Sequence, residues 1–302
     1  MTAAHGRRRA RVLVGHGRRL RVRTSDGEEL LVQPAQRQLH AVCGDWIELR
    51  QDAAHEAWLA AAVEPRRGVL HRSNARGAGE LIAANLSLLL VAVAPIPQPD
   101  LFVVDRYLCA AACAGIGALI VLNKSDLPID ATLQAELQVL GAAGHEILCV
   151  SAQHGSNLSE LRARLGGQTA ILVGQSGTGK SSLLRALLPG SEAAVGALAR
   201  DRTGRHTTTA TRLYSLPEGG ELLDSPGVRD FAPALAQLEP RALGFAEIEA
   251  LAGGCRFADC RHLREPDCAV RAAVGSGIGA RRYESYRRLR RLHDRLAARP
   301  TL

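Results

Sequence analysis

Two lysines occur among the 302 residues of this chain, against 36 arginines, and both lie in segments typical of nucleotide sites. Lys180 belongs to a glycine-rich stretch, Gly174–Ser181 (GQSGTGKS), that has the spacing of a P-loop. Lys124 is the second residue of Asn123–Asp126 (NKSD), a tetrad suited to reading guanine. An ammonium is a compact point charge that fits between phosphates or along a base, whereas a guanidinium is a broad planar fork. The two lysines therefore predict a GTPase.

The P-loop follows a short apolar run and precedes a helical pattern, which is the context that such a loop requires. Its glycines let backbone N–H groups close around phosphates, and the helix N-terminus adds its dipole. We expect Lys180 to reach the β- and γ-phosphates and the Ser181 hydroxyl to bind Mg²⁺. The residues expected to hold the nucleotide in this segment are Gly174, Gln175, Ser176, Gly177, Thr178, Gly179, Lys180, Ser181 and Ser182.

The guanine-reading tetrad follows another apolar run. Asp126 can accept hydrogen bonds from N1–H and the exocyclic amine of guanine, and adenine offers neither donor. We expect the stem of Lys124 to cover one face of the base and Asn123 to hold the loop. Ser151 and Ala152 also follow an apolar run and fit a weaker motif, in which a backbone N–H contacts guanine O6. That dipeptide carries no information in isolation.

Asp224 and Gly227 belong to a third motif, Asp-Ser-Pro-Gly, after a short apolar run. A strand-terminal Asp224 can hold Mg²⁺ through water, and Gly227 can turn its N–H toward the γ-phosphate. In the polar segment before this motif, we expect Thr208 to complete the Mg²⁺ shell. The residue after Gly227 is Val228, which cannot align a water, so we expect slow intrinsic hydrolysis, with His206 or a partner supplying the polar group. The expected catalytic residues are Lys180, Asp224, Gly227 and His206.

The order of these motifs is unusual, because the guanine-reading segments precede the P-loop. The same sheet forms if the chain is circularly permuted, since the termini and loops of such domains tolerate relocation. The motif Asp224–Gly227 then leads directly into the C-terminal part of the chain. We therefore expect ordering at the γ-phosphate to reposition that part.

Three cysteines and a histidine lie within fourteen residues of one another, as Cys255, Cys260, His262 and Cys268. Three thiolates and an imidazole suit tetrahedral Zn²⁺, and a closed shell of four protein ligands is typical of a structural site. We therefore expect one structural zinc ion. The remaining cysteines fall on apolar faces, where we expect them to fill the core; they are Cys43, Cys109, Cys113 and Cys149.

The fold predicted from these patterns has three domains. Residues 1–72 hold five short β-rich runs separated by turn signals, which predicts an OB-type barrel with a basic N-terminal arm. The five predicted strands are Arg11–Val14, Arg19–Arg23, Glu29–Val32, Asp45–Arg50 and Ala57–Val63. Residues 73–232 alternate strand and helix patterns, which predicts a doubly wound α/β GTPase domain with its functional loops at the carboxyl ends of the strands. Residues 233–302 predict a helical zinc-binding domain that ends in an arginine-rich helix, Arg281–Ala298.

The net charge of +8 is concentrated at the two ends of the chain. Residues 1–24 hold eight arginines and no acid, and residues 281–302 hold eight arginines against two acids. This distribution favours contact with nucleic acid over a merely solvated surface. We expect no signal peptide, membrane span or disulfide framework, and hence a cytoplasmic protein. No self-complementary apolar stripe indicates an oligomer, so we expect a monomer.

These motifs together resemble the ribosome small-subunit-dependent GTPase A family of bacteria, over essentially the whole chain. The most specific parts are the segment Gly204–Thr209, the P-loop, Asn123–Asp126 and the Cys255–Cys268 segment. The resemblance implies a late assembly factor that binds rRNA of the small ribosomal subunit in its GTP form and leaves on hydrolysis stimulated by that subunit. Ser225, where the family commonly has threonine, is a mild departure.

Two further hypotheses stay open. The protein could be an RNA-binding clamp in which GTP is a static ligand, and Lys180→Ala would distinguish that clamp from a hydrolase. A GTPase acting in RNA modification or metal delivery is a weaker alternative, because the sequence offers no redox, methyl-transfer or open metal site.

Overall fold

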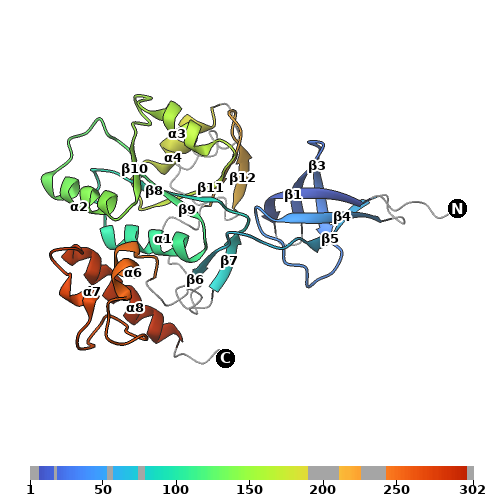
Figure 1. Cartoon of the computed structure of the whole chain (residues 1–302). Coiled ribbons are helices and arrows are strands. Elements are labelled where there is room, and N and C mark those ends of the chain that lie inside the picture. The colour runs from blue at the N-terminus through green and yellow to red at the C-terminus, as the bar shows by residue number, and fades with distance from the viewer. Residues whose placement is uncertain are drawn as a thin grey trace.

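The chain has three parts, which the computed structural model places side by side (Figure 1). A barrel projects from one side of a central α/β part, and a helical C-terminal part packs against helices of the α/β part (Figure 1). The structure describes residues 7–16, 19–52, 57–73, 79–189, 211–225 and 243–297.

Five strands close the N-terminal barrel: β1 Arg7–His16, β2 Arg19–Thr24, β3 Glu29–Pro34, β4 Trp46–Asp52 and β5 Ala57–Val63. β1 pairs antiparallel with β2 and β4, β2 pairs with β3, and β5 pairs with β3 and β4. This circuit leaves no strand edge open within the barrel, so the predicted five-stranded barrel is confirmed.

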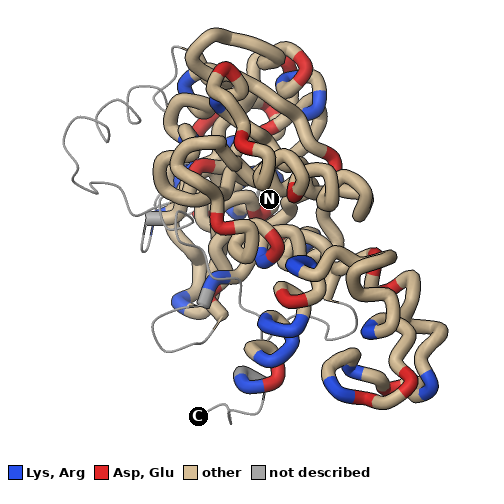
Figure 2. Tube along the Cα trace, turned by 90° about the vertical axis from the view of Figure 1, so that its left-hand side faces the viewer, with Lys and Arg blue, Asp and Glu red and all other residues tan. Residues whose placement is uncertain are grey.

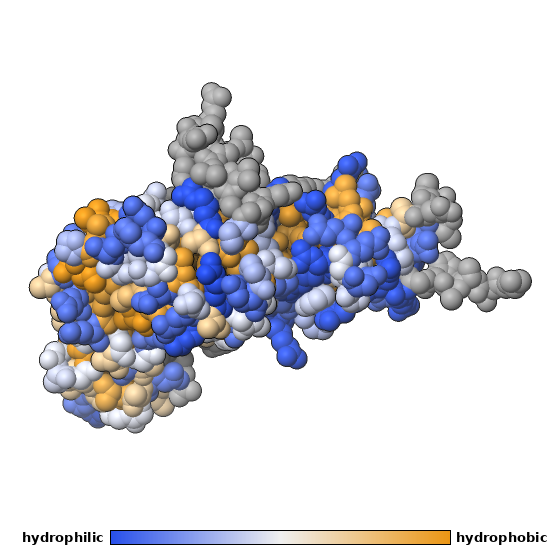
Figure 3. All heavy atoms as spheres, turned by 90° about the horizontal axis from the view of Figure 1, so that it is seen from above, coloured by the Kyte–Doolittle hydropathy of each residue, from blue (hydrophilic) through white to orange (hydrophobic). Residues whose placement is uncertain are grey.

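Alternation along these strands builds the barrel interior. Every second residue of β2 is buried, and Val12, Val22, Ile47 and Leu49 are fully buried. The intervening arginines face outward, because successive side chains of a strand point to opposite faces. Hydrophilic side chains consequently cover much of the barrel surface in the view from above (Figure 3).

A two-stranded hairpin that the sequence analysis did not predict, β6 Leu70–Ser73 and β7 Gly79–Ala83, precedes the main α/β sheet. The sheet has the order β10-β9-β8-β11-β13-β12, with β12 antiparallel to β13 and the other pairs parallel. Its strands are β8 Leu88–Val93, β9 Gly117–Leu122, β10 Glu146–Cys149, β11 Thr169–Gly174, β12 Arg212–Ser215 and β13 Glu221–Asp224.

Helices cover both faces of this sheet, so the predicted doubly wound architecture is confirmed. Leucines of α1 and α2 join one apolar cluster with strand residues, and leucines of α3 and α4 join a second cluster. Asp100 and Asp130 cap α1 and α2 by accepting hydrogen bonds from backbone N–H groups of the first turn. The helices are α1 Leu101–Cys113, α2 Ala131–Ala142, α3 Leu158–Leu165 and α4 Lys180–Leu187.

The C-terminal part contains α6 Ala246–Ala252, α7 Ala269–Ala272 and α8 Ala280–Ala297. Phe245, Ile248, Tyr286 and Leu289 form its apolar core, which also includes Cys109 of α1. None of the described helices combines the length and the apolar character needed to cross a membrane.

The expectation that every remaining cysteine fills the core is wrong for Cys149, which is exposed. Cys149 ends the edge strand β10, where alternation buries Leu148 and turns the next side chain outward. Cys43 and Cys109 are buried, and Cys113 is partly buried.

A buried ion network fastens α8 to the α/β part. The Asp105 carboxylate of α1 has no exposed surface and lies 2.6 Å from guanidinium nitrogens of both Arg281 and Arg282. Arg282 also pairs with Glu247 of α6 at 2.7 Å, and Arg281 pairs with Glu136 of α2. The first turn of α8 is therefore held by acids from three other helices.

We expect Asp105→Ala to lower the free energy of unfolding by about 3–5 kcal/mol, because it leaves the buried Arg282 guanidinium short of a counter-charge. Urea unfolding followed by circular dichroism measures this loss. Glu284→Ala is the matched control, since Glu284 forms exposed pairs with Arg287 and Arg288 on α8. Removal of the Glu284 carboxylate should lower the free energy of unfolding by about 0.5 kcal/mol or less. An equal loss of unfolding free energy in the two variants would contradict the prediction.

Candidate functional site

The candidate site lies at the carboxyl ends of three strands of the parallel sheet, β10, β9 and β11, with β8 between β9 and β11. β11 ends at Gly174 and is followed by the glycine-rich loop and α4, while β9 leads into residues 123–126 and β10 into residues 151–152. Gly174 has φ +140°, and a Cβ there would approach the Ala92 carbonyl oxygen at 2.4 Å, so this position requires glycine.

Asn123 ties the three loops together. Its side chain is 2% exposed; Oδ1 accepts from the backbone N–H of Ala152 at 3.0 Å, and Nδ2 donates to the Thr178 carbonyl at 3.0 Å. Gly179 makes room for this contact, because a Cβ there would lie 2.2 Å from Asn123 Nδ2. One buried amide therefore fixes the guanine-reading loops against the glycine-rich loop.

Lys124 extends along the same loop. Its Nζ donates to the carbonyls of Gly177 at 2.8 Å and Ile96 at 2.7 Å, so its stem crosses between two loops. Its backbone has φ +59°, a left-handed conformation that is uncommon for a residue other than glycine. Such an outlier at a tightly bonded position is typical of a functional loop.

Lys180 begins α4 and lies in the mouth of the glycine-rich loop, where its Nζ donates to the carbonyls of Gly174 and Gln175. The loop is held from within by Thr178, whose hydroxyl donates to the Gln175 carbonyl at 3.0 Å. It is also held from outside, because Gln175 Oε1 accepts from the Asp100 N–H at 2.7 Å. The ammonium is thus surrounded by backbone at the start of a helix, a favourable place for anionic phosphates.

Asp126 presents its carboxylate beside Ser151. The Ser151 hydroxyl donates to Asp126 Oδ1 at 2.5 Å, and this hydrogen bond holds the pKa of the Asp126 carboxyl below its usual range. An ionised carboxylate is the acceptor that guanine N1–H and its amine require. His154 Nδ1 lies 3.6 Å from the same oxygen and 3.2 Å from the Ser151 hydroxyl oxygen.

On the phosphate side, Asp224 ends β13, which runs parallel to β11. Ser225 follows, and its hydroxyl oxygen lies 2.9 Å from that of Thr211. The remaining predicted residues of this side are His206, Thr208 and Gly227, and they lie outside the described residues. Ser181 and Ser182 occupy the first turn of α4, and the roles of all these residues stay predictions.

Two features of this site were not predicted from the sequence. One is the segment that follows β8, and the other is His154. The carbonyl of Ile96 receives Lys124, and Pro97 packs against Gly177 of the glycine-rich loop. A proline-rich run directly after a buried strand was the available signal for that segment, because loops at strand ends build the site. His154 had no comparable signal, since a single histidine three residues after Ser151 has no fixed meaning.

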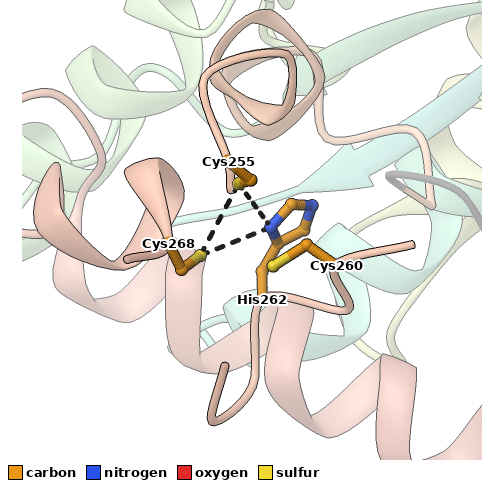
Figure 4. Close-up of side chains that lie close together, drawn as sticks. All are labelled: Cys255, Cys260, His262 and Cys268. Carbon is orange, nitrogen blue, oxygen red and sulfur yellow. Dashed lines mark hydrogen bonds between the residues drawn. The ribbon is translucent and has the colours of Figure 1, made fainter. Parts of the chain in front are cut away.

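The second candidate site is a metal centre formed by Cys255, Cys260, His262 and Cys268, whose side chains converge in Figure 4. Their ligand atoms all lie within 4.8 Å of one another. The two sulfurs of Cys255 and Cys268 are 3.8 Å apart and lie 3.4 and 3.5 Å from His262 Nδ1. Thiolates bound at 2.3 Å in a tetrahedron are about 3.8 Å apart, so the residues fit a tetrahedral ion.

The metal-binding loop is supported by α8 and by Glu265. The hydroxyls of Tyr283 and Tyr286 donate to the carbonyls of His262 and Arg261, at 2.7 and 3.0 Å. Partial burial raises the pKa of Glu265, but hydrogen bonds from backbone N–H groups within the loop outweigh this effect and lower it to about 2. The loop is therefore held by hydrogen bonds from the tyrosines of α8 and by hydrogen bonds between Glu265 and its own backbone.

Comparison with known proteins agrees with this geometry. The family model described as RsgA GTPase matches residues 63–233. The small ribosomal subunit biogenesis GTPase RsgA of Chromohalobacter salexigens is 45% identical over 254 residues, covering 82% of this chain and 74% of that protein. The protein of the same name from Azotobacter vinelandii is 42% identical over 289 residues, covering 92% of this chain and 83% of that protein.

Solved structures show the same fold. YjeQ from Thermotoga maritima superposes with a TM-score of 0.76 at 26% identity, covering 98% of this chain and all of the other. YloQ, described as a circularly permuted GTPase, superposes with a TM-score of 0.71 at 19% identity, covering 100% and 99% of the two chains, and is evidence of fold alone. Since the family model matches more than half of the residues and the two relatives exceed 40% identity over most of the chain, this chain belongs to the RsgA GTPase family.

Proposed function

We propose that this protein binds the small ribosomal subunit and acts in its late maturation, hydrolysing GTP to GDP and phosphate with stimulation by that subunit. The observation that carries the proposal is the pair of hydrogen bonds made by the buried Asn123 side chain, which joins the loops proposed to read guanine to the loop proposed to bind phosphate. The same chain also contains a barrel and a cluster of four candidate metal ligands. The names of the relatives, which denote GTPases of small-subunit biogenesis, support the choice of partner.

In this proposal the nucleotide lies across the described loops. Asp126 reads guanine, Lys124 covers the base, and Lys180 binds the β- and γ-phosphates. The Mg²⁺ ion that accompanies GTP is held by Ser181, Thr208 and, through water, Asp224. These assignments rest on the positions of the motifs at the strand ends and on the chemistry of their side chains.

We infer that the cluster Cys255, Cys260, His262 and Cys268 holds one zinc ion. Three thiolates and one imidazole favour zinc over hard cations, which prefer oxygen ligands. All four positions of a tetrahedron are protein ligands, so the proposed role is structural. The three domains proposed with this site are residues 1–72, 73–232 and 233–302, and the family match over 63–233 supports the middle one.

We propose that RNA contacts both flanking domains and that arginine makes most of these contacts. α8 carries seven arginines against two acids, and basic residues recur along this helix in Figure 2. In the barrel, Arg9 stacks on Trp46 at 4.0 Å and Arg8 on Trp58 at 5.2 Å, so arginines cover both indole rings. A cytoplasmic location follows from the proposed ribosomal partner, and a monomeric state completes the proposal.

We expect purified small ribosomal subunits to raise GTP turnover at least about tenfold over an intrinsic rate below roughly 1 per second. The stimulation should fall at higher salt, because arginine–phosphate contacts release counterions. A phosphate-release assay at two salt concentrations, with and without subunits, measures both effects. Lys180→Ala should reduce turnover about 100-fold or more. Bound GTP without any stimulation would instead favour a static RNA clamp.

We expect Asp126→Asn to weaken GDP binding about 100-fold, because a neutral amide cannot accept both hydrogen bonds from guanine. Xanthosine diphosphate should regain affinity, since xanthine has a carbonyl at position 2 to which the amide can donate. Titration with fluorescent nucleotides measures both constants. Asp130→Asn is the matched control, because Asp130 caps α2 four residues away and should leave guanine affinity unchanged.

We expect the purified chain to carry about one zinc ion, and Cys260→Ser to lose it, because the remaining ligands do not complete a tetrahedron. Elemental mass spectrometry measures the metal, and hydrogen exchange should show faster opening of residues 255–268. Cys149→Ser changes an exposed cysteine outside the cluster and is the control. Unchanged metal content in Cys260→Ser would refute the assigned shell.

A further inference from the structure

Strand β1 belongs to the barrel and to the α/β sheet at the same time. Besides its barrel neighbours it pairs with β12, with Val14 opposite Arg212, so one sheet runs without interruption from β10 to the barrel (Figure 1). Two domains linked only by a flexible connection would leave the barrel free to swing. A shared strand instead provides a direct mechanical path between them.

Arg11 of β1 lies in this junction and is 4% exposed. Its Nη2 is 2.6 Å from Glu221 Oε2 and 3.2 Å from Thr169 Oγ1, and its Nη1 donates to the Gly44 carbonyl of the barrel. The guanidinium also lies 5.0 Å from the ring centre of Trp46. Arg11 therefore contacts the barrel with one side of its guanidinium and the α/β sheet with the other.

The two partners of Arg11 in the sheet begin the strands that carry the phosphate motifs. Thr169 is the first residue of β11, which ends at Gly174, and Glu221 is the first residue of β13, which ends at Asp224. The two residues face each other in the parallel ladder, and the Thr169 hydroxyl donates to Glu221 at 2.9 Å. The glycine-rich loop begins about 17 Å along β11 from this contact.

Arg9 differs from Arg11 because its ion pair is confined to the barrel region. It lies two residues away on β1, stacks on the same Trp46 and forms a two-pronged pair with Glu64 at 2.7 and 2.8 Å. Arg9 and Glu64 both belong to the barrel region, and their side chains are 53% and 35% exposed, respectively. Arg11 alone of these two reaches β11 and β13.

We propose that Arg11 is a positioning residue that couples the barrel to the phosphate-binding strands through Glu221 and Thr169. The inference rests on the proposed function, in which RNA bound to the barrel stimulates hydrolysis. Displacement of β1 moves the buried guanidinium and with it the relative position of β11 and β13. Because coupling is reciprocal, the γ-phosphate in turn changes the surroundings of Trp46.

The first test needs no ribosomal subunit. In a Trp58→Phe background Trp46 is the sole tryptophan of the chain. Its fluorescence should differ between GDP and a non-hydrolysable GTP analogue, and Glu221→Gln should remove at least about half of that difference. Arg11→Lys is the second variant, because lysine keeps the charge and loses the fork that spans the junction.

The second test is kinetic. With small ribosomal subunits, Glu221→Gln should lower kcat about tenfold while KM for GTP and intrinsic turnover change less than about twofold. Glu64→Gln is the matched control for both tests, since it neutralises the acid that pairs with Arg9. Thermal unfolding of each variant verifies that it is folded at the assay temperature.

The outcomes separate this inference from the proposed function. A Trp46 signal that is identical for both nucleotides in the parental protein, or that survives in both Glu221→Gln and Arg11→Lys, overturns the coupling. Equal loss of intrinsic and stimulated turnover marks a purely structural role and also overturns it. A third outcome is that subunits do not stimulate the parental protein, but its Trp46 fluorescence differs between the two nucleotides and Glu221→Gln removes that difference. In that case the proposed function fails and the coupling stands.

Discussion

The arrangement of the candidate nucleotide-binding loops depends on the two hydrogen bonds made by the side chain of Asn123. A single amide offers one acceptor group and one donor group, and here the acceptor holds the loop after β10 while the donor holds the loop after β11. The amide is almost fully buried, so no water replaces a lost partner at low cost. The sheet brings the loops together, and Asn123 fixes their spacing through these two hydrogen bonds.

The two flanking parts attach to different elements of the central domain. The barrel joins the sheet at β12 and reaches the first residues of β11 and β13 through Arg11, at the ends of these strands opposite the phosphate motifs. The C-terminal part packs instead on α1 and α2, through Asp105 and Glu136. The two flanking parts therefore contact different elements of the GTPase domain: the barrel contacts β11, β12 and β13, and the C-terminal part contacts α1 and α2.

Much of this architecture could be predicted from local sequence, because it depends on alternation and on motifs at strand ends. The barrel strand Ala57–Val63 was predicted with its observed bounds, and the motif loops follow the expected strands. β1 is longer than predicted, since Arg8 and Arg9 looked like a charged arm. In the structure these arginines pair with acids and stack on indoles, which lets a charged segment form a strand.

The contacts that join the domains could not be predicted, because they depend on residues far apart in the chain. Arg11 meets partners 158 and 210 residues away, and Arg282 meets Asp105 at a separation of 177 residues. No local pattern distinguishes these arginines from the many others in a chain that uses arginine for nearly every positive charge. The β6–β7 hairpin escaped prediction for a related reason, since its two short strands lie where the barrel pattern gives way to the α/β pattern.

Helix α8 takes part in two sets of contacts that stabilise the C-terminal part: a buried ion network and hydrogen bonds to the loop of the cysteine–histidine cluster. Its first turn is anchored by Arg281 and Arg282 to helices of the α/β domain, and its next residues, Tyr283 and Tyr286, hold the metal-binding loop. The ion network holds the first turn of the helix, and the two tyrosines hold the loop that carries the candidate metal ligands. The arginines farther along α8 therefore extend from a helix whose first turn is fixed to the α/β domain.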